Sequence, residues 1–236
     1  RISARPTFHR SLSSALARDL GYQATQMRWL QEISHAVEHY VNIPTVDIPD
    51  VMSGNSYNQL RDEDFERIAL ELRRHWRLGE GPSGGMVSLL ERLGIIVGVI
   101  EMGTVKLDGL CGWSPVDGRP HILLASDKMS FARRQMDAAH EMAHVILHRD
   151  VAEKQLKEDL KLIDMQAFQL SSAFLLPTTT YPVEIRYPSL AAMAAAKERW
   201  RVSIKAQIKR LHDLNILNDE YAVHFYKMYS AKGCTK

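Results

Sequence analysis

Apolar residues recur every three or four positions over much of the chain, which is the spacing of an amphipathic helix. Two such stripes over residues 11–41 predict one or two helices. A third stripe over residues 65–76 predicts a helix that Asp62 or Asp64 caps and that the glycine-rich residues 79–85 end. The members of the stripes are Leu12, Ala15, Leu16 and Leu20, then Trp29, Leu30, Ile33, Val37 and Tyr40, then Phe65, Ile68, Ala69, Leu72 and Trp76.

A strand-like pattern follows a short predicted helix over residues 86–93. The run IIVGVIEM at 95–102 is rich in β-branched residues and has the length of a strand, and residues 107–113 and 121–125 predict two more strands. After residue 130 the helical spacing returns. The predicted helices there are 131–148, 152–176, 190–200, 203–214 and 219–229. We therefore expect an α+β protein, mostly helical, with a small sheet of three or more strands.

The strongest break in the pattern lies at residues 42–58 (NIPTVDIPDVMSGNSYN). This segment contains two prolines, a glycine and several turn-forming residues, which predicts an extended linker. It separates a predicted helical N-terminal region, residues 1–58 with the linker included, from a core over residues 59–186. Residues 187–236 are predicted to form a C-terminal helical subdomain packed on that core.

Composition narrows the class of protein. With 45% hydrophobic and 25% charged residues, the chain is neither disordered nor fibrous. Its 30 Lys and Arg against 28 Asp and Glu exclude a strongly basic nucleic-acid binder, so any DNA contact would be local. The cysteines, Cys111 and Cys234, are too far apart for a C-x-x-C metal site. We expect a cytoplasmic protein, because the sequence has neither a signal peptide nor a membrane-spanning run of about 18 apolar residues.

The segment 137–148 (DAAHEMAHVILH) carries the candidate chemistry. His140 and His144 are four residues apart, so on a helix their imidazoles share one face about 6 Å apart and can bind one metal ion. Glu141 flanks that face, where its carboxylate can act as the general base toward a metal-bound water. This is the H-E-x-x-H spacing of zinc peptidases. Two satisfied core histidines on an ordinary helix are the weaker alternative, because the surrounding helix is apolar and buried imidazoles need a partner.

A catalytic zinc also needs a third protein ligand and an open fourth position. Leu147 and Asp150 stand where the metzincin pattern has Gly and His, which excludes that class. His148 lies about 12 Å of helix rise beyond His140 and is therefore predicted at the surface or in the second shell behind the ligands. A carboxylate from a second helix is the remaining option.

Three acidic residues lie in the segment 157–177, which covers most of the predicted helix 152–176: Glu158, Asp159 and Asp164. Asp164 alone stands among apolar neighbours (LKLIDMQAF), where a lone carboxylate is costly unless it meets a metal or a cation. A salt bridge to a nearby Lys or Arg is the alternative role for Asp164.

These segments together resemble the ImmA/IrrE family of metallopeptidases. The resemblance lies in RRQMD at 133–137, AAHEMAHVILH at 138–148 and IDMQAFQLSSAFLLP at 163–177, and weaker similarity extends over most of the chain. It implies a zincin-like (gluzincin) fold with one Zn²⁺. The implied ligands are His140, His144 and Asp164, and Glu141 is the implied catalytic base.

The sequence departs from the family pattern in several places, among them Phe168 and Leu170, where Asn and Phe are common. Ala143 replaces the Gly before the second histidine. Asp164 replaces the usual Glu and is shorter by one methylene, which leaves Glu158 and Asp159 as fallback ligands. Tyr181 and His148 are candidates for side chains that support the ligands from behind. Tyr181, His148 or an arginine could stabilise the oxyanion.

The resemblance is to the group whose peptidase domain is fused to a helix-turn-helix (XRE-type) regulator. It implies a zinc endopeptidase that cleaves a repressor-type protein, itself of the helix-turn-helix class, and so relieves transcriptional repression. A non-catalytic or ligand-sensing regulatory domain of such a regulator is the alternative. Because the chain begins at Arg1, we expect a fragment of a longer protein that contacts DNA only through an N-terminal module that is absent here.

The segment 200–217 also has a helix-turn-helix layout, with basic residues at Lys205, Lys209 and Arg210. We favour packing on the core over DNA contact, because the second helix has a continuous apolar face. Its members are Ile204, Ile208, Leu211 and Leu214.

Overall fold

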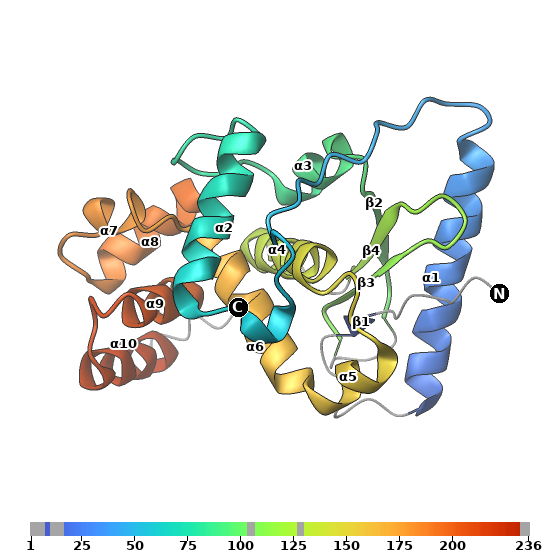
Figure 1. The fold of residues 1–236 in the computed structure, drawn as a ribbon. Helices are drawn as coiled ribbons and strands as arrows, with labels where there is room; N and C mark the ends of the chain where they lie inside the picture. Colours follow the sequence, from blue (N-terminus) through green and yellow to red (C-terminus); the bar gives the residue numbers. More distant parts are fainter. Residues whose placement is uncertain (1–7, 10–16, 103–106, 127–129, 232–236) are drawn as a thin grey trace.

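The computed structural model describes residues 8–9, 17–102, 107–126 and 130–231 (Figure 1). The described strands are β1 (Phe8–His9), β2 (Ile96–Ile100), β3 (Gly109–Trp113) and β4 (Pro120–Ala125). The helices are α1 (Ala17–Val37), the 3-10 turn η1 (Tyr57–Gln59), α2 (Asp62–His75), α3 (Met86–Arg92), α4 (Phe131–Leu147), α5 (Glu153–Glu158), α6 (Leu160–Leu175), α7 (Tyr181–Glu184), α8 (Leu190–Trp200), α9 (Ile204–Asp213) and α10 (Asp219–Ala231). The predicted class, mostly helical with a small sheet, is confirmed.

The sheet is mixed and lies between α1 and α4 (Figure 1). The strand order is β1-β3-β4-β2, in which β3 runs antiparallel to β1 and β4, and β2 runs parallel to β4. Successive side chains alternate between the two faces. Leu110 and Leu123 pack with Met27 of α1, whereas Cys111 and Ile122 join the core on the α4 side. Burial on both faces explains why these strands are almost uniformly apolar.

The helix α1 docks through a narrower face than its apolar pattern predicts. Met27 is buried against the sheet, and the amide of Gln23 donates a hydrogen bond to Met102 O at 3.2 Å. Ser34 Oγ lies 2.7 Å from His121 Nε2 of β4. The predicted stripe that includes Trp29 and Ile33 is instead largely exposed. The residues Leu12, Ala15 and Leu16 of the other stripe, and Cys234, lie outside the described residues.

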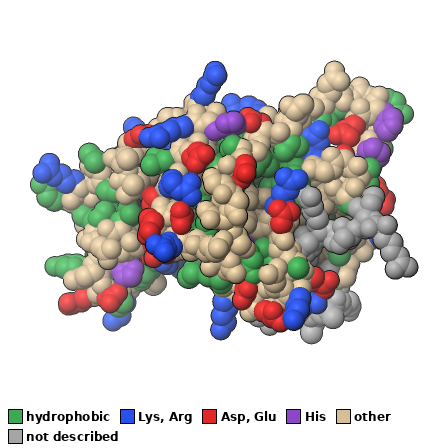
Figure 2. Space-filling view, viewed as in Figure 1, with side chains coloured by type: hydrophobic (Ala, Val, Ile, Leu, Met, Phe, Trp, Pro, Cys, Tyr) green, Lys and Arg blue, Asp and Glu red, His purple; other side chains and the backbone are tan. Residues whose placement is uncertain are grey.

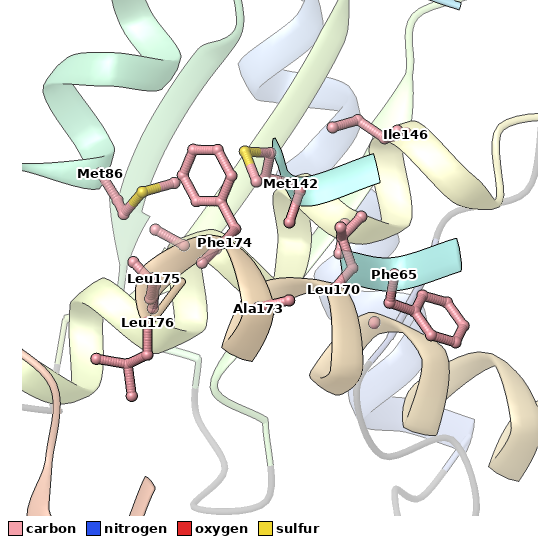
Figure 3. Packing of buried hydrophobic residues seen from close by; sticks show 14 of the residues in the cluster. Phe65, Met86, Met142, Ile146, Leu170, Ala173, Phe174, Leu175 and Leu176 are labelled. Atoms are coloured by element: carbon pink, nitrogen blue, oxygen red, sulfur yellow. The ribbon is translucent and has the colours of Figure 1, made fainter. Parts of the chain in front are cut away.

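The pairing of α4 with α6 forms the centre of the main core. Figure 3 shows Met142 and Ile146 of α4 near Leu170 and Phe174 of α6. Most of these side chains are fully buried, and each such side chain stabilises the fold by about 1.5–3 kcal/mol relative to exposure. This packing fixes the orientation of α4, and therefore of its histidine face, against α6.

Residues 42–58, which we call the strap, connect α1 with α2 and run across the molecule without a helix or strand before η1. The prediction of an extended segment is confirmed, but the strap is closely docked. Arg119 donates to Pro44 O at 2.7 Å and to Gly94 O at 2.6 Å. Gly94 has a φ of +76°, and a Cβ there would lie 2.6 Å from Pro44 O. Only glycine fits at position 94, where the strap passes over it. Near its end the strap contains the buried Tyr57.

Three predicted boundaries were wrong. The predicted helix 152–176 is divided by Asp159 (φ −105°, ψ 18°), which ends α5 and precedes α6. The strand predicted over 107–113 begins only at Gly109. The N-cap of α2 is Arg61, whose N–H donates to the Asp64 carboxylate at 3.0 Å, so Asp64 supports the cap from inside the helix. The short helix α7 was not predicted.

The C-terminal helices pack against the rest of the chain. Ile208 and Leu211 of α9 are fully buried. Arg210, one of the basic residues considered for DNA contact, donates to Leu176 O at 2.9 Å and forms a bidentate pair with Glu66 at 2.5 and 2.9 Å. Figure 2 shows basic and acidic side chains interspersed over the visible face. Within the described part of the chain, none of the helices has both the length and the apolar character required to cross a membrane.

Candidate metal centre

The two histidines of the H-E-x-x-H segment lie on consecutive turns of α4. His140 Nε2 and His144 Nε2 are 3.0 Å apart, and their rings meet edge to face with centroids 4.7 Å apart. Both side chains are buried. Two nitrogens that both presented lone pairs at this distance would repel each other, so the geometry suits a cation between them.

Asp164 reaches the histidines from α6. Its Oδ1 lies 3.2 Å from His140 Nε2, and one ligand atom from each of His140, His144 and Asp164 lies within 4.8 Å of the others. The Asp164 side chain is 36% exposed, so the cluster is open to solvent on this side.

The fallback ligands point elsewhere. Asp159 accepts a hydrogen bond from the Tyr57 hydroxyl at 2.6 Å, and Glu158 lies 3.8 Å from Lys154 at the surface. Among the described residues, the Asp164 carboxylate contacts a histidine of the cluster and does not pair with a Lys or Arg.

Zinc fits this donor set. Two ligands at about 2.0–2.1 Å from a tetrahedral zinc lie about 3.3 Å apart, which is close to the distances from His140 Nε2 to His144 Nε2 and to Asp164 Oδ1, 3.0 and 3.2 Å. Two imidazoles and one carboxylate leave a fourth position for water, and the exposed edge of Asp164 gives water a route to it. His140, His144 and Asp164 are therefore a possible metal site.

Glu141 is buried against β3. The strand begins at Gly109, which has no side chain. A Cβ at Gly109 would lie only 2.8 Å from Glu141 Oε1. The thiol of Cys111, on the same face of β3, also lies beside this carboxylate. Burial, together with the charge of Glu141 and a hydrogen bond to it, raises the pKa of the Cys111 thiol well above its usual value. The strand thus provides Glu141 with a fitted recess and a protonated neighbour.

His148 is wholly buried, so of the two predicted places, the surface or a position behind the ligands, the surface is excluded. Its Nδ1 lies 3.0 Å from His144 Nδ1, and its Nε2 lies 3.0 Å from the side-chain oxygen of Gln166. Burial lowers the pKa of His148 to about 4, which keeps the ring neutral near pH 7. The structure therefore places His148 directly behind His144.

Tyr181 lies among the C-terminal helices. Its hydroxyl donates to the side-chain oxygen of Gln207 at 2.9 Å, and its ring meets Trp200 edge to face at 5.6 Å. Burial raises the pKa of this phenol. Tyr181 therefore packs α7 against α8 and α9.

Sequence reasoning did not identify Gly109, Cys111, Gln166 or Phe168 as residues of the site. The Phe168 ring lies 4.4 Å from the His140 ring, one turn of α6 beyond Asp164. Its position four residues after Asp164 was the one available signal, because i and i+4 side chains share a helix face. The other three reach the site through folding contacts that carry no sequence pattern.

An H-E-x-x-H helix with a carboxylate from a neighbouring helix is the arrangement of a metallopeptidase-type centre. The family comparison agrees with this class: the peptidase M78 model, described as the IrrE N-terminal-like domain, matches residues 90–212. Because this match covers slightly more than half of the chain, the protein belongs to that family. The resemblance stated from the motifs is confirmed.

Solved structures include a Mycobacterium tuberculosis transcriptional regulator that is similar to this chain, with a TM-score of 0.45 and 18% sequence identity. The match covers 69% of this chain and 49% of the regulator, so the chain spans about half of the length of that protein. A comparison with curated proteins found no match.

Proposed function

We propose that this protein is a zinc-dependent endopeptidase that cleaves a repressor-type regulatory protein and thereby relieves transcriptional repression. The observation that carries the proposal is the recess in which β3 holds Glu141 beside the His140, His144 and Asp164 cluster. A structural histidine pair would not require a carboxylate fitted against a strand that lacks a side chain at the point of contact.

The chain's own residues divide the work of peptide hydrolysis. His140, His144 and Asp164 would hold the zinc, which supplies a Lewis acid and lowers the pKa of a water molecule. The Glu141 carboxylate accepts a proton from the attacking water and then passes it to the leaving amine. The Cys111 thiol, kept protonated by burial, orients the carboxylate without competing for that proton.

The test is co-expression with candidate helix-turn-helix repressors, beginning with any that the neighbouring genes encode. We expect one of them to be cut by the wild-type protein and to stay intact with Glu141→Gln, while the zinc content measured by elemental analysis stays near one ion per chain. Glu158→Gln is the matched control, because Glu158 is an exposed carboxylate on α5 whose loss should leave cleavage unchanged.

Two results would contradict the proposal. Cleavage that persists in Glu141→Gln would show that Glu141 is not the general base. Zinc binding without cleavage of any of these repressors would favour the alternative of a ligand-sensing regulatory domain.

We also propose that residues 59–186 form the peptidase core, that residues 1–58 form a separate N-terminal region and that residues 187–236 form a helical subdomain. The contacts of Arg210 with Glu66 and Leu176 support the packing of the last part on the core. The family match at residues 90–212 extends from the core into α9.

A further inference from the structure

A chain of buried polar groups runs from the end of the strap to one of the two histidines of the metal site. The side-chain amide of Gln166 donates to the backbone oxygen of Tyr57 at 2.7 Å. Gln166 Oε1 lies 3.0 Å from His148 Nε2, and His148 Nδ1 lies 3.0 Å from His144 Nδ1. All four residues are at most 5% exposed, so bulk water does not compete for these hydrogen bonds.

The contact between Gln166 and Tyr57 fixes which group donates and which accepts in every later hydrogen bond of this series. A backbone oxygen can only accept a hydrogen bond, so the NH₂ group of Gln166 must face Tyr57. The reversed amide would place two oxygens 2.7 Å apart in a buried site and would lose the hydrogen bond. The oxygen of Gln166 therefore faces His148.

The same reasoning shows which ring nitrogen of His148 carries the proton. An amide oxygen also only accepts, so His148 Nε2 carries the proton of that contact. An imidazole with its single proton on Nε2 has its lone pair on Nδ1. His144 Nδ1 must be the donor toward it, and this leaves the lone pair of His144 on Nε2, the atom that lies 3.0 Å from His140 Nε2 in the ligand cluster.

We propose that Gln166 and His148 are positioning residues that hold His144 in the tautomer with its proton on Nδ1, so that Nε2 is ready to bind the metal. This inference rests on the proposed zinc site. Outer groups that accept the second N–H of a ligating histidine fix both its tautomer and its ring orientation, and their loss lowers metal affinity by about 10–100-fold. Here the acceptor is a second histidine, His148. The backbone carbonyl of Tyr57 orients Gln166, and Gln166 in turn determines which nitrogen of His148 carries the proton.

The first experiment measures zinc affinity of the full chain by competition with a chelator. We expect Gln166→Leu to weaken zinc binding by about tenfold or more, because His148 loses the acceptor that fixes its proton on Nε2. Gln169→Leu is the matched control, since Gln169 lies on the same helix and donates instead to Asp62 at the surface, at 2.8 Å. Equal zinc affinity in Gln166→Leu and in the wild type would overturn the inference.

The second experiment needs no variant. Nitrogen-15 NMR of the histidine-labelled, zinc-free protein reports which ring nitrogen of each histidine carries the proton. We expect His144 to be protonated on Nδ1 and His148 on Nε2. A His144 protonated on Nε2 in the folded apoprotein would overturn the inference.

Neither readout depends on peptidase activity. A protein that binds zinc with the expected tautomers but cuts nothing would contradict only the proposed function. An active peptidase whose His144 has the opposite tautomer would contradict only the positioning role of Gln166 and His148.

Discussion

Gly109 lacks a side chain at the point where the Glu141 carboxylate packs against β3. The nearest atoms to a Cβ at this position are Oε1, Cγ and Cδ of Glu141, at 2.8, 3.0 and 3.1 Å. Because the crowded atoms form the end of a flexible side chain, we expect Gly109→Ala to displace Glu141 and to leave the backbone in place. Zinc binding should persist, and cleavage should fall by about 100-fold or more, the usual contribution of a general base.

The control for this prediction is Gly85→Ala, because the only atom that its Cβ would approach is Ser88 Oγ at an ordinary 3.8 Å. Cleavage assays and zinc titration of the two variants make the comparison. Full activity in Gly109→Ala would show that Glu141 does not need this recess.

At the scale of residues, the sequence identified the groups whose chemistry follows from local spacing. His140, Glu141 and His144 stand on one helix, and Asp164 was recognisable as a carboxylate among apolar neighbours. Gln166 was not, because its partner Tyr57 lies 109 positions away along the chain. Contacts of this kind depend on how the strap crosses the core and leave no periodic signal in the sequence.

At the scale of elements, the C-terminal end of α6 is held by two buried arginines. Arg73 of α2 donates to Phe174 O at 2.6 Å, to Gly79 O at 2.8 Å and to Gly81 O. Arg210 of α9 holds Leu176 O. The last carbonyls of a helix lack partners within the helix and attract cations, so these arginines fasten α6 from two sides.

We therefore predict that Arg73→Met lowers the free energy of unfolding by about 3 kcal/mol or more, because it leaves buried carbonyls without donors. Arg67→Met on the same helix is the control. Arg67 is 45% exposed and pairs with Asp64 and Glu71 at the surface, so its loss should cost less than about 1 kcal/mol. Denaturant titrations compare the variants, and equal losses would contradict the fastening role.

A second prediction at this scale concerns Tyr57 and pH. Burial, followed by the hydrogen bond to Asp159 and the charges of Asp159 and Glu158, raises the pKa of the Tyr57 phenol from 10.0 to about 12. Above pH 10 the unfolded chain releases this proton while the folded chain retains it. The free energy of unfolding should therefore fall as the pH rises from 10 toward 12.

Tyr57→Phe should remove this part of the alkaline loss, which denaturant titrations at a series of pH values will measure. It should also cost about 1–2 kcal/mol at neutral pH through the lost hydrogen bond. Tyr187→Phe is the control, because Tyr187 is 80% exposed. Parallel pH curves for the wild type and Tyr57→Phe would show that Tyr57 does not titrate in this way.

The elements themselves were largely predictable, because hydrophobic periodicity is a local property. The break at Asp159 was not, since residues 152–176 have continuous helical character. The Tyr57 hydroxyl binds the Asp159 carboxylate at this break, and that tertiary contact overrides the local preference. The strap was predicted as extended, but its docking on Gly94 and Arg119 depends on the tertiary fold.

At the scale of the whole molecule, the candidate metal site joins α4 and α6, the two helices at the centre of the main core. Ligands that bind only the folded state stabilise it by mass action. We predict that zinc at 100 times its dissociation constant raises the free energy of unfolding by about 2.7 kcal/mol. The melting temperature should then rise by about 5–10 °C, and a chelator should reverse the shift.

Thermal unfolding of His140→Ala should show no zinc-dependent shift. His212→Ala is the control, because His212 lies on α9 and contacts Asp219 at the surface, so its shift should equal that of the wild type. A shift of the same size in His140→Ala would place the stabilising zinc elsewhere.

The strap has a consequence for the order in which the protein assembles. Its two ends are tied to residues far along the chain: Pro44 is bound by Arg119 and Tyr57 by Gln166. During synthesis the strap therefore leaves the ribosome well before either of its fastening points exists. Since contacts between distant segments form late, we expect the strap to dock only after α4 and α6 have paired.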